Sequence, residues 1–105
     1  MGEPTIVHVP GPRIRLEEND TLREELLAHV AAGRTALILN FHEVEFVDSS
    51  FLGLMIIVLK RVTAYGGDVR ICCLQKPLES IFELMRLDRL FSVYETEEAA
   101  VQSFK

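Results

Sequence analysis

The longest strand-like apolar run in this chain is Thr35-Ala36-Leu37-Ile38-Leu39-Asn40-Phe41. A run of this kind is typical of a strand that is covered on both faces or lies centrally in a sheet. It is followed closely by Phe46-Val47-Asp48-Ser49-Ser50-Phe51-Leu52-Gly53. Because Asp and Ser are favoured at helix N-termini, this order predicts an apolar segment that leads into a helix.

The same alternation continues on both sides of this region. Upstream, a β-branched run predicts a strand over 5–9, which 13–16 continue beyond the kink at Pro10-Gly11-Pro12, and helical spacing predicts a helix that ends at Gly33. Downstream, the pattern predicts a strand over 69–74, a helix from Pro77, a short strand at Val93-Tyr94 and a final helix capped by Thr96.

Strands that alternate with helices predict an α/β fold with right-handed crossovers. The 105 residues fit a single small domain, 1–105, and leave no room for a second core. We therefore expect a mixed, mostly parallel sheet of four or five strands, with helices mainly on one face.

Charge and hydropathy exclude several classes of function. The net charge of −5 argues against nucleic acid as a partner, because phosphate binding needs clustered Lys and Arg. No apolar run approaches the length of about 20 residues that a membrane span requires, so no membrane insertion is expected. The N-terminus lacks the basic and apolar regions of a signal peptide, which favours a cytoplasmic protein.

The residues that most often catalyse reactions or bind metals are scattered. His8 is predicted to point outward from a strand, His29 to lie on a helix surface and His42 in a loop, without metal-ligand spacing. Cys72 and Cys73 are neighbours in a strand, so we expect them to point to opposite faces and to act as small hydrophobic residues. The sequence thus predicts no catalytic residue, metal or cofactor, and a protein that is not an enzyme.

The segment around Ser49 and Ser50 allows three interpretations. Both serines lie at or near a predicted helix N-cap, where a purely structural role is common. A serine nucleophile, as in a small hydrolase, would need a base and the glycines of a nucleophile elbow, which are missing here. A phosphorylated serine fits better, because free N–H groups and the helix dipole favour negative charge at a helix N-terminus.

Taken together, four segments resemble the signature of STAS domains, and more narrowly that of the bacterial anti-sigma factor antagonists. These segments are 37–41 with Val44, 46–53, 66–71 and 87–99, which includes Leu87-Asp88-Arg89-Leu90-Phe91. The resemblance covers most of the chain from Thr5 onward and implies the STAS fold.

The resemblance also implies a function. In that family an unphosphorylated antagonist binds an anti-sigma factor that is also a serine kinase, and so frees the sigma factor. The kinase phosphorylates the first serine after the aspartate, which breaks the complex, and a metal-dependent serine phosphatase reverses the modification. Carried over to this sequence, the phosphorylated residue is Ser49, and the partner-binding residues are Asp48, Ser50, Phe51, Leu52 and Gly53.

An alternative is a STAS interaction module that is not phosphorylated, in a sensory scaffold or in a lipid or anion transport system. The chain has Phe51 where the family usually has glycine, and Arg13 in a region where many relatives carry an acidic residue. If Leu52, Ile56, Leu59 and Thr63 face inward, Phe51 lies near the boundary of the buried face. It would then either anchor a partner or pack on Val44 or Phe46.

Overall fold

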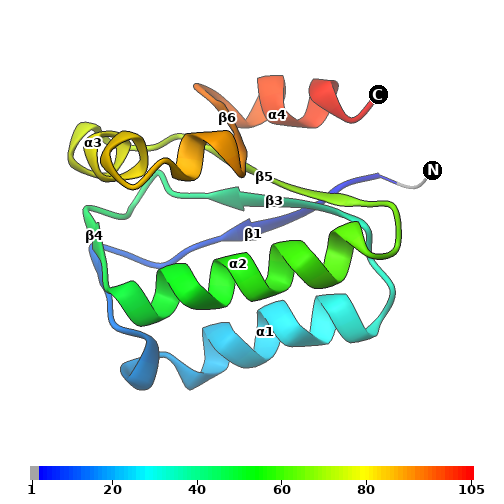
Figure 1. Cartoon of the computed structure of the whole chain (residues 1–105), viewed down its shortest axis with the longest axis horizontal. Coiled ribbons are helices and arrows are strands. Elements are labelled where there is room, and N and C mark those ends of the chain that lie inside the picture. The colour runs from blue at the N-terminus through cyan, green and yellow to red at the C-terminus, as the bar shows by residue number, and fades with distance from the viewer. Residues whose placement is uncertain (1–2) are drawn as a thin grey trace.

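The computed structural model describes residues 3–105 as a layered α/β structure (Figure 1). Four parallel strands form the main sheet in the order β1-β3-β5-β6, with β1 at Thr5–His8, β3 at Ala36–Asn40, β5 at Asp68–Cys72 and β6 at Ser92–Tyr94. The connections between successive strands contain α1 (Asp20–Ala31), α2 (Ser49–Thr63) and α3 (Lys76–Leu84). The predicted α/β class and mostly parallel sheet are confirmed.

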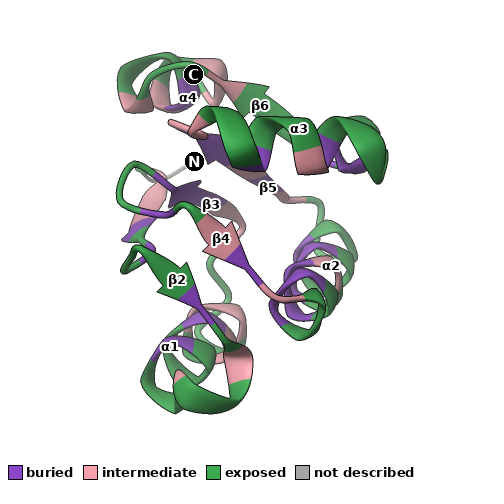
Figure 2. Cartoon of the chain, turned by 90° about the vertical axis from the view of Figure 1, so that its left-hand side faces the viewer, coloured by how far each residue is buried: buried purple, intermediate pink, exposed green. Residues whose placement is uncertain are grey.

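A second, two-stranded sheet lies beside the main one. It pairs β2 (Arg13–Ile14) with β4 (Phe46–Val47) (Figure 2). The prediction that 13–16 continue the first strand is therefore wrong. Gly11 lies so close to the Glu43 carbonyl that no side chain would fit there, and the Pro12 carbonyl accepts a hydrogen bond from Glu45 N at 2.7 Å. These contacts turn the chain away from β1 and place β2 next to β4.

The helices cover both faces of the main sheet. Helices α1 and α2 lie side by side on one face, α4 (Glu97–Ser103) lies on the other, and α3 lies near β4 (Figure 1). Two short 3-10 turns complete the order of elements: η1 (Leu16–Glu18) precedes α1 and η2 (Leu87–Arg89) precedes β6. The larger hydrophobic core lies on the side of α1 and α2, in agreement with helices mainly on one face.

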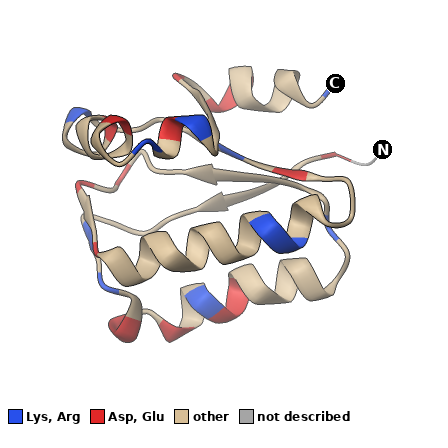
Figure 3. Cartoon of the chain, in the orientation of Figure 1, with Lys and Arg blue, Asp and Glu red and all other residues tan. Residues whose placement is uncertain are grey.

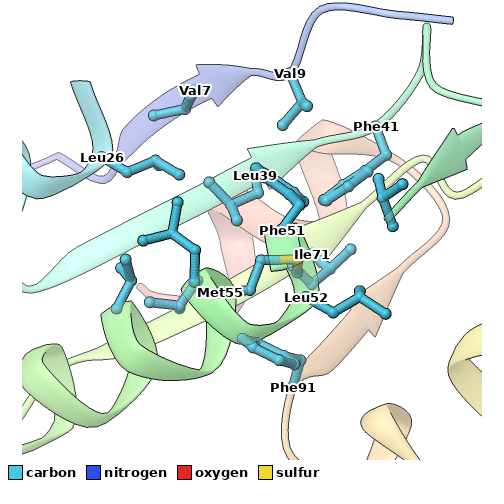
Figure 4. Close-up of a cluster of buried hydrophobic side chains, with 14 of the residues drawn as sticks. Val7, Val9, Leu26, Leu39, Phe41, Phe51, Leu52, Met55, Ile71 and Phe91 are labelled. Carbon is cyan, nitrogen blue, oxygen red and sulfur yellow. The ribbon is translucent and has the colours of Figure 1, made fainter. Parts of the chain in front are cut away.

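Aromatic rings fill the part of this core that underlies the start of α2. Phe41, directly after β3, makes an edge-to-face contact with Phe51, with ring centroids 6.4 Å apart (Figure 4). It makes a second one with Phe82, at 6.3 Å. Phe51 has an exposed fraction of 0%. Its predicted position near the boundary of the buried face is therefore wrong, and its ring is a central part of the core.

The predicted inward face of α2 is only partly correct. Leu52 and Leu59 are buried and Ile56 is half-buried, but Thr63 is exposed, so that prediction is wrong. Because α2 packs against both the sheet and α1, its buried face is broader and rotated from the predicted one. It also includes Phe51, Leu54, Met55, Val58 and Val62.

A smaller core of Ile38, Cys72 and Ala100 lies on the side of α4. Cys73 packs against the same cluster, so the prediction of opposite faces is wrong. The reason is local: Cys73 follows the last residue of β5 and has a φ of 63°, outside the extended conformation that alternates side chains. Burial, a hydrogen bond with Cys73 and the nearby charges of Cys73 and Glu97 raise the pKa of the Cys72 thiol to about 12. This thiol therefore stays protonated at neutral pH and is a poor nucleophile.

Candidate functional site

Asp48 joins three segments at the N-terminus of α2. It is the N-cap residue of the helix, and its Oδ1 accepts a hydrogen bond from Phe51 N at 2.9 Å. Its Oδ2 accepts from Leu16 N in η1 at 3.1 Å, and its own N–H donates to the Ile14 carbonyl of β2 at 3.0 Å. One side chain thus caps the helix and fixes the loop that leads to α1.

Ser49 and Ser50 follow as the first two residues of α2, and both are exposed. The prediction that they lie at or near the N-cap is confirmed, with Asp48 as the cap itself. The sequence from Ser49 to Leu59 contains no charged residue, so α2 is uncharged over most of its length (Figure 3). A negative charge added in this first turn would meet the positive end of the helix dipole, and its acidic neighbour in the sequence is Asp48, whose two carboxylate oxygens already accept backbone hydrogen bonds.

The next two residues, Phe51 and Leu52, point into the protein. Both side chains are buried in the larger core, directly below the exposed serines. The predicted partner-binding residues therefore differ in their exposure. Ser50 and Gly53 lie at the surface, Asp48 is half-buried, and Phe51 and Leu52 support the surface from inside.

An exposed row of residues continues from the serines along α2. Ser49, Gly53 and Ile57 are spaced four apart and so lie on one helical face, with Ser50 three residues before Gly53. A Cβ atom at Gly53 would meet no atom within 4 Å beyond its own stretch of helix backbone, and Ile57 is exposed. We call these four residues the α2 row. Ile57 is absent from the predicted site, although its spacing from Ser49 and Gly53 is visible in the sequence.

A shallow hollow of about 230 Å³ opens beside this row. It is lined by Leu16, Glu17, Arg23, Asp48 and Ser50. Arg23 is exposed and lies 3.3 Å from Asp20, a contact of little energetic consequence at the surface. The hollow therefore offers polar groups of both signs next to Ser50.

The three histidines form their contacts elsewhere in the protein. His8 is exposed, as predicted, with its Nε2 at 2.9 Å from Glu97 Oε1, and His42 is exposed in the loop after β3. The predicted surface position of His29 is wrong, because its side chain is mostly buried on α1. None of the hydrogen bonds found within 3–105 joins a histidine to either serine. The described residues also contain no group of three His, Cys, Asp or Glu side chains placed to hold a metal ion.

None of the helices within residues 3–105 has both the length and the apolar character that a membrane crossing requires.

Comparison with known families identifies the class of protein. A model of the STAS domain matches residues 2–100, so the chain belongs to the STAS domain family. Among its curated relatives is BtrV of Bordetella bronchiseptica, provisionally named an anti-sigma factor antagonist. It is 27% identical over 86 residues, which cover 82% of this chain and 74% of BtrV.

Solved structures share the fold. An anti-sigma factor antagonist (STAS) domain protein from Planctomyces limnophilus has a TM-score of 0.84 at 23% identity and covers 95% of this chain and 89% of its own. The phosphorylated form of the Bacillus cell fate determinant SpoIIAA has a TM-score of 0.73 at 21% identity, with coverage of 95% and 89%. The STAS domain of a SulP transporter from Vibrio cholerae has a TM-score of 0.73 at 15% identity, with coverage of 96% and 80%.

Proposed function

We propose that this chain is an anti-sigma factor antagonist that works by partner switching. The observation that carries the proposal is the exposed Ser49 in the first turn of α2, at the start of an uncharged row that rests on a buried aromatic core. The names of the relatives support this class of function, and SpoIIAA, which shares the fold, has a phosphorylated form.

In the unmodified state, the α2 row is the surface that binds the anti-sigma factor. Ser50 and Gly53 make the contacts, and the absence of a side chain at Gly53 lets a partner approach the helix backbone closely. Phe51 and Leu52 contribute from below by holding this turn in place, and Asp48 does so by capping it. The five residues thus serve one binding surface in two different ways.

Phosphorylation of Ser49 ends this complex. The anti-sigma factor acts as a serine kinase and transfers the γ-phosphoryl group of ATP to Ser49 Oγ, while the hydroxyl proton is released and ADP leaves. The phosphate brings up to two negative charges into a contact that excludes water, where each unpaired charge costs several kcal/mol. The helix dipole lets the folded chain accept the same charge without unfolding.

A metal-dependent serine phosphatase restores the antagonist by hydrolysing the phosphoserine to serine and inorganic phosphate. The metal belongs to that enzyme, and this chain is the substrate of both reactions rather than a catalyst. It needs no cofactor of its own. Because the kinase reaction uses ATP, we propose that the switch operates in the cytoplasm.

The test is to incubate the chain with the serine-kinase anti-sigma factors of its source organism and ATP, and to map the product by mass spectrometry. We expect one phosphate on Ser49, its loss in Ser49→Ala and its retention in Ser50→Ala. Modification of Ser50 alone would contradict the assignment. No phosphate on either serine would favour the alternative, a STAS module that binds a sensory scaffold or a transport system without modification.

A further inference from the structure

Arg15 lies beside the start of α2, although it belongs to a different part of the chain. Both of its neighbours in the sequence bond to Asp48: the Ile14 carbonyl accepts a hydrogen bond from Asp48 N at 3.0 Å, and Leu16 N donates one to Asp48 Oδ2 at 3.1 Å. These bonds extend the pairing of β2 with β4 by one residue and bring Arg15 opposite Asp48. Ser49 is the next residue after Asp48, so Arg15 is also a close neighbour of Ser49.

The side chains of Arg15 and Asp48 lie on the solvent side of the small sheet. Each of its two strands buries its second residue, and on the other side the Arg13 guanidinium lies 5.6 Å from the centre of the Phe46 ring (Figure 2). Side chains alternate along a strand, and the backbone of both Arg15 and Asp48 is extended, with φ of −115° and −85°. The two side chains therefore lie on the same side as Arg13 and Phe46.

The guanidinium of Arg15 is unpaired. In the described part of the chain it takes part in no ion pair and no side-chain hydrogen bond, and the residue is exposed. Two other arginines of this region are already engaged: Arg13 rests on the ring of Phe46, and Arg23 lies 3.3 Å from Asp20. Of these three, Arg15 is the one that can take a new anion without giving up a contact.

A phosphate on Ser49 would need such a cation. The phosphate would lie near the carboxylate of Asp48, and Glu17 lines the hollow that also includes Asp48 and Ser50. Adjacent Cα atoms are about 3.8 Å apart and paired strands about 4.8 Å apart, so Ser49 is within reach of the long Arg15 side chain. Because the Cα–Cβ bonds of a helix tilt toward its N-terminus, the Ser49 side chain leans toward the small sheet.

We propose that Arg15 is the intramolecular partner of the phosphate on Ser49. This inference rests on the proposed phosphorylation of Ser49 and adds how the modified state is held. The planar guanidinium presents paired N–H donors that match two oxygens of a phosphate. In the unmodified chain the Arg15 cation is exposed next to the start of the α2 row. Phosphorylation therefore changes this surface twice, because it adds an anion and also engages the neighbouring cation.

The test needs neither a kinase nor a partner, because the chain is produced with phosphoserine incorporated at position 49 during translation. The second ionisation of a phosphoserine has a pKa of about 6, and a nearby cation lowers this pKa because it favours the doubly charged phosphate. Titration followed by ³¹P NMR measures it directly. We expect the pKa of the phosphate to be lower by about 0.5 in the phosphorylated wild type than in phosphorylated Arg15→Gln. Asp48 and Glu17 are present in both proteins, so the difference reports on Arg15.

Two further variants make the result specific. Arg34→Gln removes the same charge from an exposed site between α1 and β3, at the opposite end of the sheet from β4, and should leave the phosphate pKa at the wild-type value (Figure 1). Arg15→Lys keeps the charge without the paired donors and should give an intermediate value. Circular dichroism checks that each variant folds. The same phosphate pKa in wild type and Arg15→Gln, or an equal increase in Arg34→Gln, would overturn the proposal. Whether a kinase modifies Ser49 is decided separately, by the mass spectrometry described above.

Discussion

The N-termini of α2 and α4 are capped by the same kind of hydrogen bond but have different surroundings. At α2, Asp48 accepts a hydrogen bond from Phe51 N; at α4, the Thr96 hydroxyl accepts one from Ala99 N at 3.1 Å. The side chain of Glu97 in the first turn of α4 is then engaged, because its Oε1 lies 2.9 Å from both Asn40 Nδ2 and His8 Nε2. In α2 the corresponding side chain is Ser49, which is exposed.

The difference shows how one local motif serves two purposes. The first turn of α4 carries carboxylates that satisfy the helix dipole and bind the helix to β1 and β3, so its role is structural. The first turn of α2 carries no acidic side chain, so the charge at this helix N-terminus is the carboxylate of the N-cap residue Asp48, and a phosphate on Ser49 would add to it. A phosphate on Ser49 would lie next to one carboxylate, that of Asp48, whose two oxygens already accept backbone hydrogen bonds, whereas a phosphate at the start of α4 would meet both Glu97 and Glu98.

The largest expected effect comes from comparing a buried residue below the α2 row with an exposed residue of the row. Phe51→Ala removes a fully buried ring that packs on Phe41 and should lower the free energy of unfolding by about 3 kcal/mol or more. Ile57→Ala, at an exposed position of the same helix, should change it by less than about 0.5 kcal/mol but weaken binding of the anti-sigma factor. Urea denaturation and a binding titration measure both. Comparable stability losses in the two variants would contradict the division.

The caps should contribute less than the core, and unequally. Asp48→Ala removes acceptors for two backbone N–H groups and should lower the free energy of unfolding by about 2 kcal/mol. Thr96→Ala removes one acceptor and should cost about 1 kcal/mol. Only Asp48→Ala should also impair partner binding. If Thr96→Ala proved the more destabilising variant, Asp48 would not have the connecting role assigned to it.

The core below α4 predicts a pH dependence. Because the pKa of Cys72 is raised to about 12, its contribution to stability is complete below the unfolded value of 9.0 and is lost as the pH rises toward 12. Between pH 8 and pH 10 the wild type should lose about 1 kcal/mol more stability than Cys72→Ala. Denaturation curves with a reductant present at both pH values give this difference. Parallel losses in the two proteins would argue against the shift.

The smallest effect expected is a gain in stability. Gly53 lies inside α2, and an added methyl group would meet no atom within 4 Å. Gly53→Ala should therefore stabilise the chain by about 0.5–1 kcal/mol through helix propensity. If a partner approaches the backbone here, the same variant should bind it less tightly. Unchanged affinity would remove Gly53 from the binding surface.

The sequence allowed the order of strands and helices to be predicted because hydrophobic periodicity is a local signal. It also placed Ser49 at the start of α2, since Asp and Ser mark helix N-termini. The burial of Phe51 was not predictable in this way, because it depends on Phe41 and Phe82, which come from other elements. The pairing of β2 with β4 likewise depends on the approach of Gly11 to Glu43, a contact between distant segments.

The most direct test of the account is the affinity of the anti-sigma factor for wild type, Ser49→Ala and Ser49→Asp, measured by calorimetry. Gln102→Glu, which also adds one negative charge but at an exposed site on α4, is the control. We predict similar affinities for wild type, Ser49→Ala and Gln102→Glu, and an affinity lower by about a hundredfold for Ser49→Asp, because its charge enters a dry contact. Equal affinities for all four proteins would contradict the proposal that Ser49 is the switch.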